Sequence, residues 1–73
     1  MNNSIENRRK LMEENEAKLE GRVSERIKLL IARQYLWGEY TKPLEELTDQ
    51  ELLAVAYVGP KTVAEIRKVI PAP

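Results

Sequence analysis

Cysteine and histidine are both absent from this sequence of 73 residues. The chain therefore has no disulfide and no thiol nucleophile, and it lacks the usual ligands of zinc. Histidine is also the commonest general acid or base, and the remaining carboxylates read as helix-start charges, so no nucleophile–base pair stands out. We expect a protein that is not an enzyme and that requires no metal and no other cofactor.

Long apolar runs are missing as well. No stretch approaches the roughly 18 apolar residues of a membrane-spanning helix, and no signal sequence opens the chain. We expect a soluble, cytoplasmic protein without membrane contact. At this length the chain supports one small core, near the limit at which burial alone stabilises a domain. Phenylalanine is absent too, so Trp37 is predicted to contribute most to that core, with Tyr35 and Tyr40 beside it. The alternative for these three aromatic residues is that they stack on the bases of a single strand.

The formal net charge is zero, but the charges are unevenly distributed. Residues 1–38 hold eight basic and six acidic residues, residues 39–57 one and five, and residues 58–73 three and one. An acidic middle thus lies between two basic ends. This distribution allows a local basic face, with a modest affinity for nucleic acid because few cations are available to neutralise phosphates.

No segment alternates apolar and polar residues as a strand would, so the chain is predicted to be all-α. Ser4 can cap a first, highly charged helix that extends to residue 20. Its apolar residues Ile5, Met12 and Leu19 repeat every seven positions, which is half of a coiled-coil seam. Two interpretations stay open: a solvated helical arm, or a helix that joins two copies of the chain in a homodimer.

Gly21 weakens this first helix and marks either a kink in a long helix or a break. From residue 23 apolar residues recur at steps of three and four, which predicts an amphipathic helix over residues 23–37, ended by Gly38. A short connector and one helical turn over residues 43–47 follow. We expect two parts, a charged N-terminal helical arm of residues 1–20 and a compact domain of residues 21–73.

The last third of the sequence has the pattern of two short helices joined by a tight turn. Thr48 and Glu51 form a capping box at the start of the first, which we expect over residues 47–57. The second, residues 62–70, has apolar residues three and four positions apart and stops before Pro71.

The turn itself holds Gly59, where we expect a positive φ that glycine adopts without strain. Lys61 and Thr62 come next, at a helix start whose unpaired N–H groups attract anions. Two interpretations apply to this pair. Either they contact a phosphate, or Thr62 is an ordinary N-cap beside an exposed lysine.

These residues resemble the helix-hairpin-helix family, in which an apolar residue, a glycine and a lysine–hydroxyl pair precede a helix. More specifically, residues 44–70 are similar to the carboxy-terminal domain of the bacterial RNA polymerase α subunit. Four segments carry the similarity in the same order: Leu44-Glu45-Glu46-Leu47, Thr48-Asp49-Gln50-Glu51-Leu52-Leu53, Val58-Gly59-Pro60-Lys61-Thr62 and Ala64-Glu65-Ile66. The connector before them is shorter than in that family, and the charged arm has no counterpart there.

The resemblance implies a module that binds duplex DNA in bacterial or phage transcription, with RNA polymerase as a protein partner. In the family the turn amides and the lysine–hydroxyl pair contact phosphates, which corresponds to Gly59, Lys61 and Thr62. An arginine of the preceding helix enters the minor groove there, and Arg33 is the nearest candidate.

Arg67 and Lys68 complete the candidate DNA-binding residues. If the apolar residues of the last helix face inward, both cations lie on its exposed side, where they are merely solvated or steer phosphates. The leading hypothesis is a small non-enzymatic DNA-binding module. The alternative is a protein–protein interaction module that uses the helical scaffold and the N-terminal helix to bind a partner or a second copy.

Overall fold

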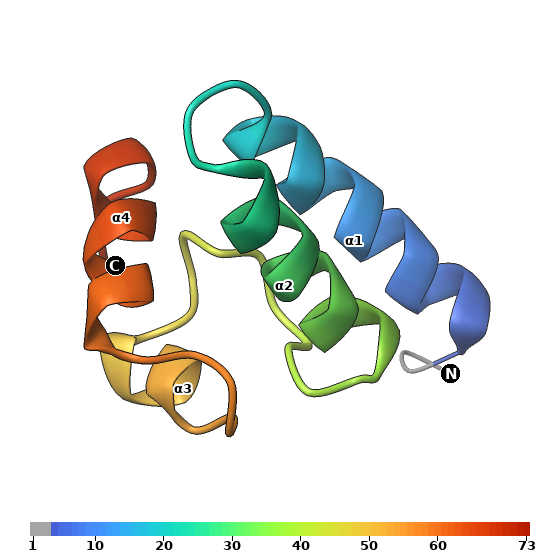
Figure 1. The fold of residues 1–73 in the computed structure, drawn as a ribbon. Coiled ribbons are helices and arrows are strands. Elements are labelled where there is room, and N and C mark those ends of the chain that lie inside the picture. Colours follow the sequence, from blue (N-terminus) through green and yellow to red (C-terminus); the bar gives the residue numbers. More distant parts are fainter. Residues whose placement is uncertain (1–3) are drawn as a thin grey trace.

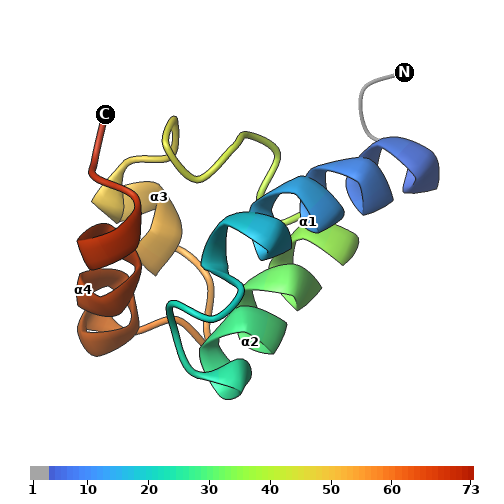
Figure 2. The same cartoon turned by 90° about the horizontal axis from the view of Figure 1, so that it is seen from above.

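The computed structural model describes residues 4–73, which form four helices (Figure 1). These are α1 Ile5–Leu19, α2 Glu25–Leu36, α3 Asp49–Leu53 and α4 Pro60–Val69. Residues 4–73 contain no strand, so the prediction of an all-α fold is confirmed. Helices α1 and α2 lie side by side and antiparallel, and α3 and α4 pack together at one side of this pair (Figures 1 and 2).

Gly21 separates α1 from α2 instead of kinking one long helix. Its φ is 74°, a left-handed conformation that glycine adopts without strain. The next helix then starts afresh, because the hydroxyl of Ser24 accepts the N–H of Ile27 at 3.2 Å. Of the two alternatives at this glycine, the chain takes the break, and the break lets α2 fold back onto α1.

The N-terminal helix is part of the core and not a solvated arm. Asn15 and Leu19 are fully buried, and Met12 packs against the core cluster. Of the three residues in the seven-residue repeat, only Ile5 is mainly exposed. The half seam thus faces α2 of its own chain, because the antiparallel pair needs an apolar stripe on both helices. The boundary expected at residue 20 therefore does not divide the chain into two separately packed parts.

Two tyrosines form the centre of the core. Tyr35 and Tyr40 are buried, and their rings meet edge to face with centroids 5.6 Å apart. The hydroxyl of Tyr35 donates to the carbonyl of Lys42 at 2.8 Å, and that of Tyr40 donates to the carbonyl of Leu52 at 2.7 Å. Burial raises the pKa of both phenols, so they stay protonated donors.

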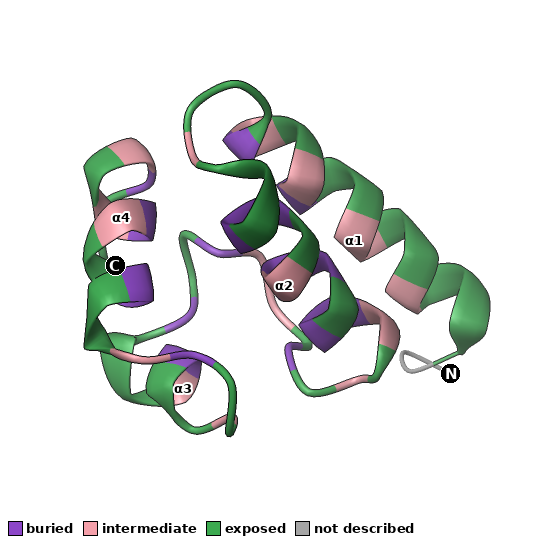
Figure 3. Ribbon diagram, viewed as in Figure 1, coloured by how far each residue is buried: buried purple, intermediate pink, exposed green. Residues whose placement is uncertain are grey.

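Trp37, predicted to contribute most to the core, is 56% exposed, so that prediction is wrong. The reason is its position on α2. It is the C-cap of α2 and lies four residues after the exposed Arg33, so it belongs to the exposed side of this helix. Figure 3 distinguishes the buried and exposed positions along α2. Gly38, as predicted, ends the helix with a φ of 79°.

Helix α3 has the predicted capping box but is shorter than expected. The hydroxyl of Thr48 accepts the N–H of Glu51 at 3.1 Å, and the Glu51 carboxylate accepts the N–H of Thr48 at 2.9 Å. The helix ends at Leu53 instead of residue 57. The carbonyl of Leu52, which the next turn would need as an acceptor, already accepts the hydroxyl of Tyr40.

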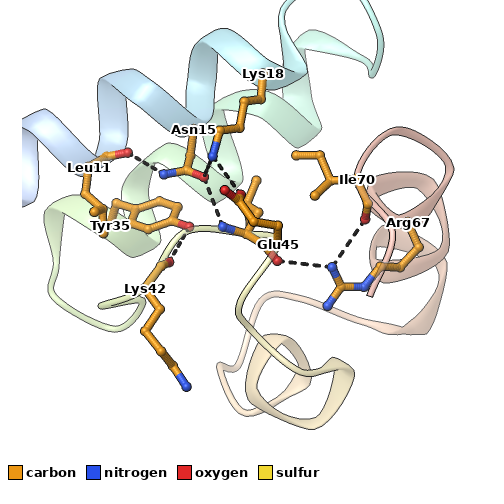
Figure 4. A network of polar contacts seen from close by, with 9 residues as sticks. Leu11, Asn15, Lys18, Tyr35, Lys42, Glu45, Arg67 and Ile70 are labelled. Atoms are coloured by element: carbon orange, nitrogen blue, oxygen red, sulfur yellow. Dashed lines mark hydrogen bonds and ion pairs between the residues drawn. The ribbon is translucent and has the colours of Figure 1, made fainter. Parts of the chain in front are cut away.

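The turn over residues 43–47 connects α1 to α4 through its backbone. The N–H of Leu44 donates to the side-chain oxygen of Asn15 at 3.0 Å, and the carbonyl of Leu44 accepts Arg67 Nη1 at 3.1 Å (Figure 4). The amide of Asn15 also donates to the carbonyl of Leu11 at 2.7 Å. The two peptide groups that flank the Leu44 Cα are therefore hydrogen-bonded to different helices, one to α1 and the other to α4.

Replacing Asn15 by leucine tests this bond. Asn15→Leu leaves the buried N–H of Leu44 without its acceptor, and we expect the free energy of unfolding to fall by about 2 kcal/mol. Glu13→Leu introduces the same side chain at an exposed position of α1 and should change the free energy of unfolding by no more than about 0.5 kcal/mol. Urea unfolding measures both. Equal stability of the two variants would contradict the role of Asn15.

The carboxyl groups of Glu45 and Glu51 should make the fold sensitive to acid. Lys18 Nζ lies 2.7 Å from Glu45 and Lys42 Nζ lies 2.8 Å from Glu51, and these bonds hold the pKa of both carboxyls below the ordinary 4.5. A pKa lowered by folding stabilises the protein above the unfolded pKa. That contribution is lost as the pH falls through the folded value.

We therefore expect the free energy of unfolding to decline as the pH is lowered below about 4.5. Glu51→Gln should be less stable than the parent at pH 7 and equally stable at pH 3, since glutamine keeps the capping geometry without the charge. Glu46→Gln is the control at an exposed neighbouring position. The explanation fails if Glu51→Gln and the parent lose the same stability between the two pH values.

Candidate nucleic-acid interface

Helix α4 begins differently from the three other helices of residues 4–73. Side-chain oxygens of Ser4, Ser24 and Thr48 cap α1, α2 and α3, and each of these helices has an acidic residue in its first turn. Helix α4 has neither: Gly59 is its N-cap, Pro60 is its first residue, and no acid lies in its first turn. The N–H groups that follow keep the positive end of the helix dipole uncovered by a side chain.

Gly59 does not have the positive φ that we expected. Its φ of −105° and ψ of 178° are extended backbone, because the residue is an N-cap and not the corner of a tight turn. A Cβ built on it would meet no atom within 4 Å. Neither backbone conformation nor packing within the chain requires glycine here. What the missing side chain does is leave the start of α4 open.

Lys61 and Thr62 differ in exposure although they are neighbours. The side chain of Lys61 is exposed, whereas Thr62 is 9% exposed and faces the core beside Val63. The interpretation of Thr62 as an N-cap is wrong, because α4 starts two residues earlier than predicted. At the start of α4, Lys61 can therefore offer its ammonium group and its N–H, and Thr62 mainly its N–H.

Arg67 is not on the exposed side of α4, and that prediction is wrong. Its side chain lies over the connector and donates to the carbonyls of Leu44, Leu47 and Ile70 (Figure 4). Its Nε also lies 2.7 Å from the carboxylate of Asp49. The long side chain of arginine reaches these acceptors across the packed face of α4, so its donors are already used within the fold.

Arg33 and Lys68 are both exposed, as expected, but they lie on different elements. No ion pair joins Arg33 to another residue in 4–73. Lys68 forms an ion pair with Glu65 at 3.1 Å. Lys68 comes seven residues after Lys61 and thus lies about 10 Å further along α4. The start of α4, Arg33 and Lys68 are consequently three separate positions and not one cluster.

Sequence reasoning missed the outer face of α2. Its members are exposed and follow one another at steps of three and four residues: Arg26, Leu29, Arg33 and Trp37. The exposed Arg22 lies in the loop before Ser24, the N-cap of α2. Lys18, Lys28 and Lys42 are each ion-paired, but none of these three arginines is paired with an acid in residues 4–73. The same spacing of three and four residues in the sequence is the signal that predicts this exposed face.

An open groove of about 270 Å³ lies at the end of this face. It is lined by residues of two segments: Gln34, Trp37, Glu39, Ala54, Val55, Ala56 and Tyr57. The second segment leads directly into α4. Helix α2 and the start of α4 lie on the side of the molecule away from the turn of residues 43–47 (Figures 1 and 2).

No family model matches the chain, and the comparisons with curated proteins and with solved structures found no match either. The resemblance of residues 44–70 to the polymerase α domain thus stays a prediction that rests on those residues.

In the part of the chain that spans residues 4–73, no three residues among His, Cys, Asp and Glu are grouped as metal ligands would be. None of its helices combines the length and the apolar character needed to cross a membrane.

The placement of Arg67 predicts a structural effect of its replacement. Arg67→Ala leaves carbonyls of the connector without their charged donor, so the free energy of unfolding should fall by about 2–3 kcal/mol. Lys68→Ala, next to it, removes an exposed cation and should cost no more than about 0.5 kcal/mol. Thermal and urea unfolding compare the two. A fully stable Arg67→Ala variant would show that the guanidinium does not hold the connector.

Proposed function

We propose that the chain is a small non-enzymatic module that binds the phosphates of duplex DNA at the start of α4. The observation that carries this proposal is the combination of an uncovered helix N-terminus with the exposed ammonium group of Lys61. A phosphate there would accept the N–H groups of Lys61 and Thr62 and would also be attracted by the lysine charge. Gly59 allows the phosphate to approach because no side chain stands in front of these amides.

Two further cations support contact with a duplex. Arg33 is exposed without an ion pair in residues 4–73. Lys68 forms only an exposed pair with Glu65, which a phosphate can replace at little cost. Arg67 takes no direct part in this proposal. It would act as a positioning residue, because it ties α4 to the connector.

Binding of this kind should be weak and tolerant of sequence, since phosphate contacts position a protein without reading bases. Phosphate contacts would supply nearly all of this binding and the net charge of the chain is zero, so the affinity should be low and should fall further as salt is raised. Such a module would act beside a larger partner. A role in transcription, with RNA polymerase as that partner, comes from the resemblance of residues 44–70.

Self-association through α1, the alternative considered for the sequence, has less support. Met12 and Leu19 of the proposed seam pack within the chain's own core, which leaves Ile5 as the exposed member. A single apolar residue per helix is too little for a coiled-coil interface.

Two variants test the start of α4. The first reverses the charge of Lys61, and the second places a carboxylate at the N-cap. Lys61→Glu should weaken binding to a 16-base-pair duplex by at least about tenfold at low salt, because it replaces attraction by repulsion. Gly59→Asp should abolish binding as well while leaving the helix at least as stable, because aspartate is a good N-cap and its carboxylate would occupy the same N–H groups. Fluorescence anisotropy of a labelled duplex measures the affinity, and urea unfolding measures the stability.

Glu65→Gln serves as the control, since it changes the charge of α4 away from the helix start. It should leave the affinity unchanged or slightly raised. The proposal is refuted if the parent binds no duplex at low salt, or if Lys61→Glu and Gly59→Asp bind as the parent does.

A further inference from the structure

Two large aromatic side chains are left in solvent around the groove at the end of α2. Trp37 is 56% exposed and Tyr57 is 70% exposed, although burial of either ring would stabilise so small a core. Both line the same groove, with Ala54, Val55 and Ala56 between them. Exposed aromatic groups gathered at one depression are typical of a binding site.

A line of positive charge leads to this groove. Arg26 and Arg33 lie seven residues apart on the outer face of α2, about 10 Å along the helix axis, and Trp37 follows one turn later. Arg22 is exposed in the loop that precedes Ser24, the N-cap of α2. Because these three arginines have no acidic partner in residues 4–73, the full charge of each guanidinium is available to a ligand.

The size of the groove limits what it can hold. At about 270 Å³ it is smaller than the roughly 300–1,000 Å³ of sites for drug-sized ligands, so it fits one flat group rather than a whole ligand. Its walls are small apolar side chains, aromatic rings and the polar side chains of Gln34 and Glu39. The charge beside it requires a ligand that carries several negative groups spaced along a line.

We propose that this groove binds an unpaired base of single-stranded nucleic acid, stacked on Trp37 and Tyr57, while the phosphates of the strand follow the arginines of α2. Bases within a duplex are stacked on each other, so only an unpaired base offers its face to an aromatic side chain. Aromatic rings beside a row of cations are the usual combination in proteins that bind single strands. This inference does not depend on the start of α4.

Glu39 sets the direction of the strand in the groove. It is the acidic residue of the lining, so it repels phosphate and leaves the backbone on the side of α2. Its carboxylate can instead accept a hydrogen bond from the exocyclic amino group of a base. We therefore expect oligodeoxycytidine to bind more tightly than oligodeoxythymidine, and Glu39→Gln to reduce this difference.

Trp37 is the single tryptophan of the chain, so its fluorescence reports directly on the groove. Titration of the full chain with a 12-nucleotide oligodeoxycytidine should quench this fluorescence. Tyr57→Ala should weaken binding by about tenfold, whereas Tyr57→Phe, which keeps the ring, should bind like the parent. Arg26→Ala and Arg33→Ala should each weaken binding and reduce its dependence on salt.

The controls separate this inference from the proposed function. Lys61→Glu should lose duplex affinity and retain the quenching by the single strand, and Tyr57→Ala should do the reverse. Circular dichroism of each variant checks that the helices are intact. The proposal is overturned if saturating oligonucleotide leaves the Trp37 fluorescence unchanged, or if Tyr57→Ala binds it like the parent. Quenching by a poly-glutamate peptide but not by the oligonucleotide would assign the groove to a protein ligand and overturn it equally.

Discussion

The N–H and the carbonyl of Leu44 are bonded to opposite parts of the molecule, to Asn15 of α1 and to Arg67 of α4. Both partners are polar residues withdrawn from solvent, and each would be unfavourable there without these bonds. Helices α1 and α4 share few direct contacts, so the backbone of the connector transmits the position of one to the other. In a chain with so small a core, this polar connection does what a larger apolar interface does in bigger domains.

The arrangement of the proposed interfaces follows from that connection. Helix α4 is held by the guanidinium of Arg67 near its C-terminal end, whereas its start has no side-chain bond because Gly59 is its N-cap. Helix α2 lies on the same side of the molecule as this start (Figures 1 and 2). Acidic residues are concentrated in residues 39–51, around the connector and α3, where several of them pair with lysines. A chain without net charge can in this way present cations on one side.

Local features were predictable from the sequence, and features that depend on distant residues were not. The caps by Ser4 and Thr48 and the end of α2 at Gly38 are confirmed, because each depends on residues within one turn. The exposure of Trp37 and the bonds of Arg67 could not be predicted, because they depend on where the connector crosses the helices. The open start of α4 was expected, but Gly59 does not have the positive φ that was expected for it.

The bonds of Asn15 and Arg67 to Leu44 involve main-chain atoms of the connector, which every amino acid except proline provides in full. The side chains of the connector are consequently under little constraint beyond the burial of two leucines, and they can diverge freely during evolution. Two chains with this architecture need share only an asparagine 29 positions before, and an arginine 23 positions after, a buried residue. Common ancestry in such a lineage would survive in that spacing long after overall identity had faded.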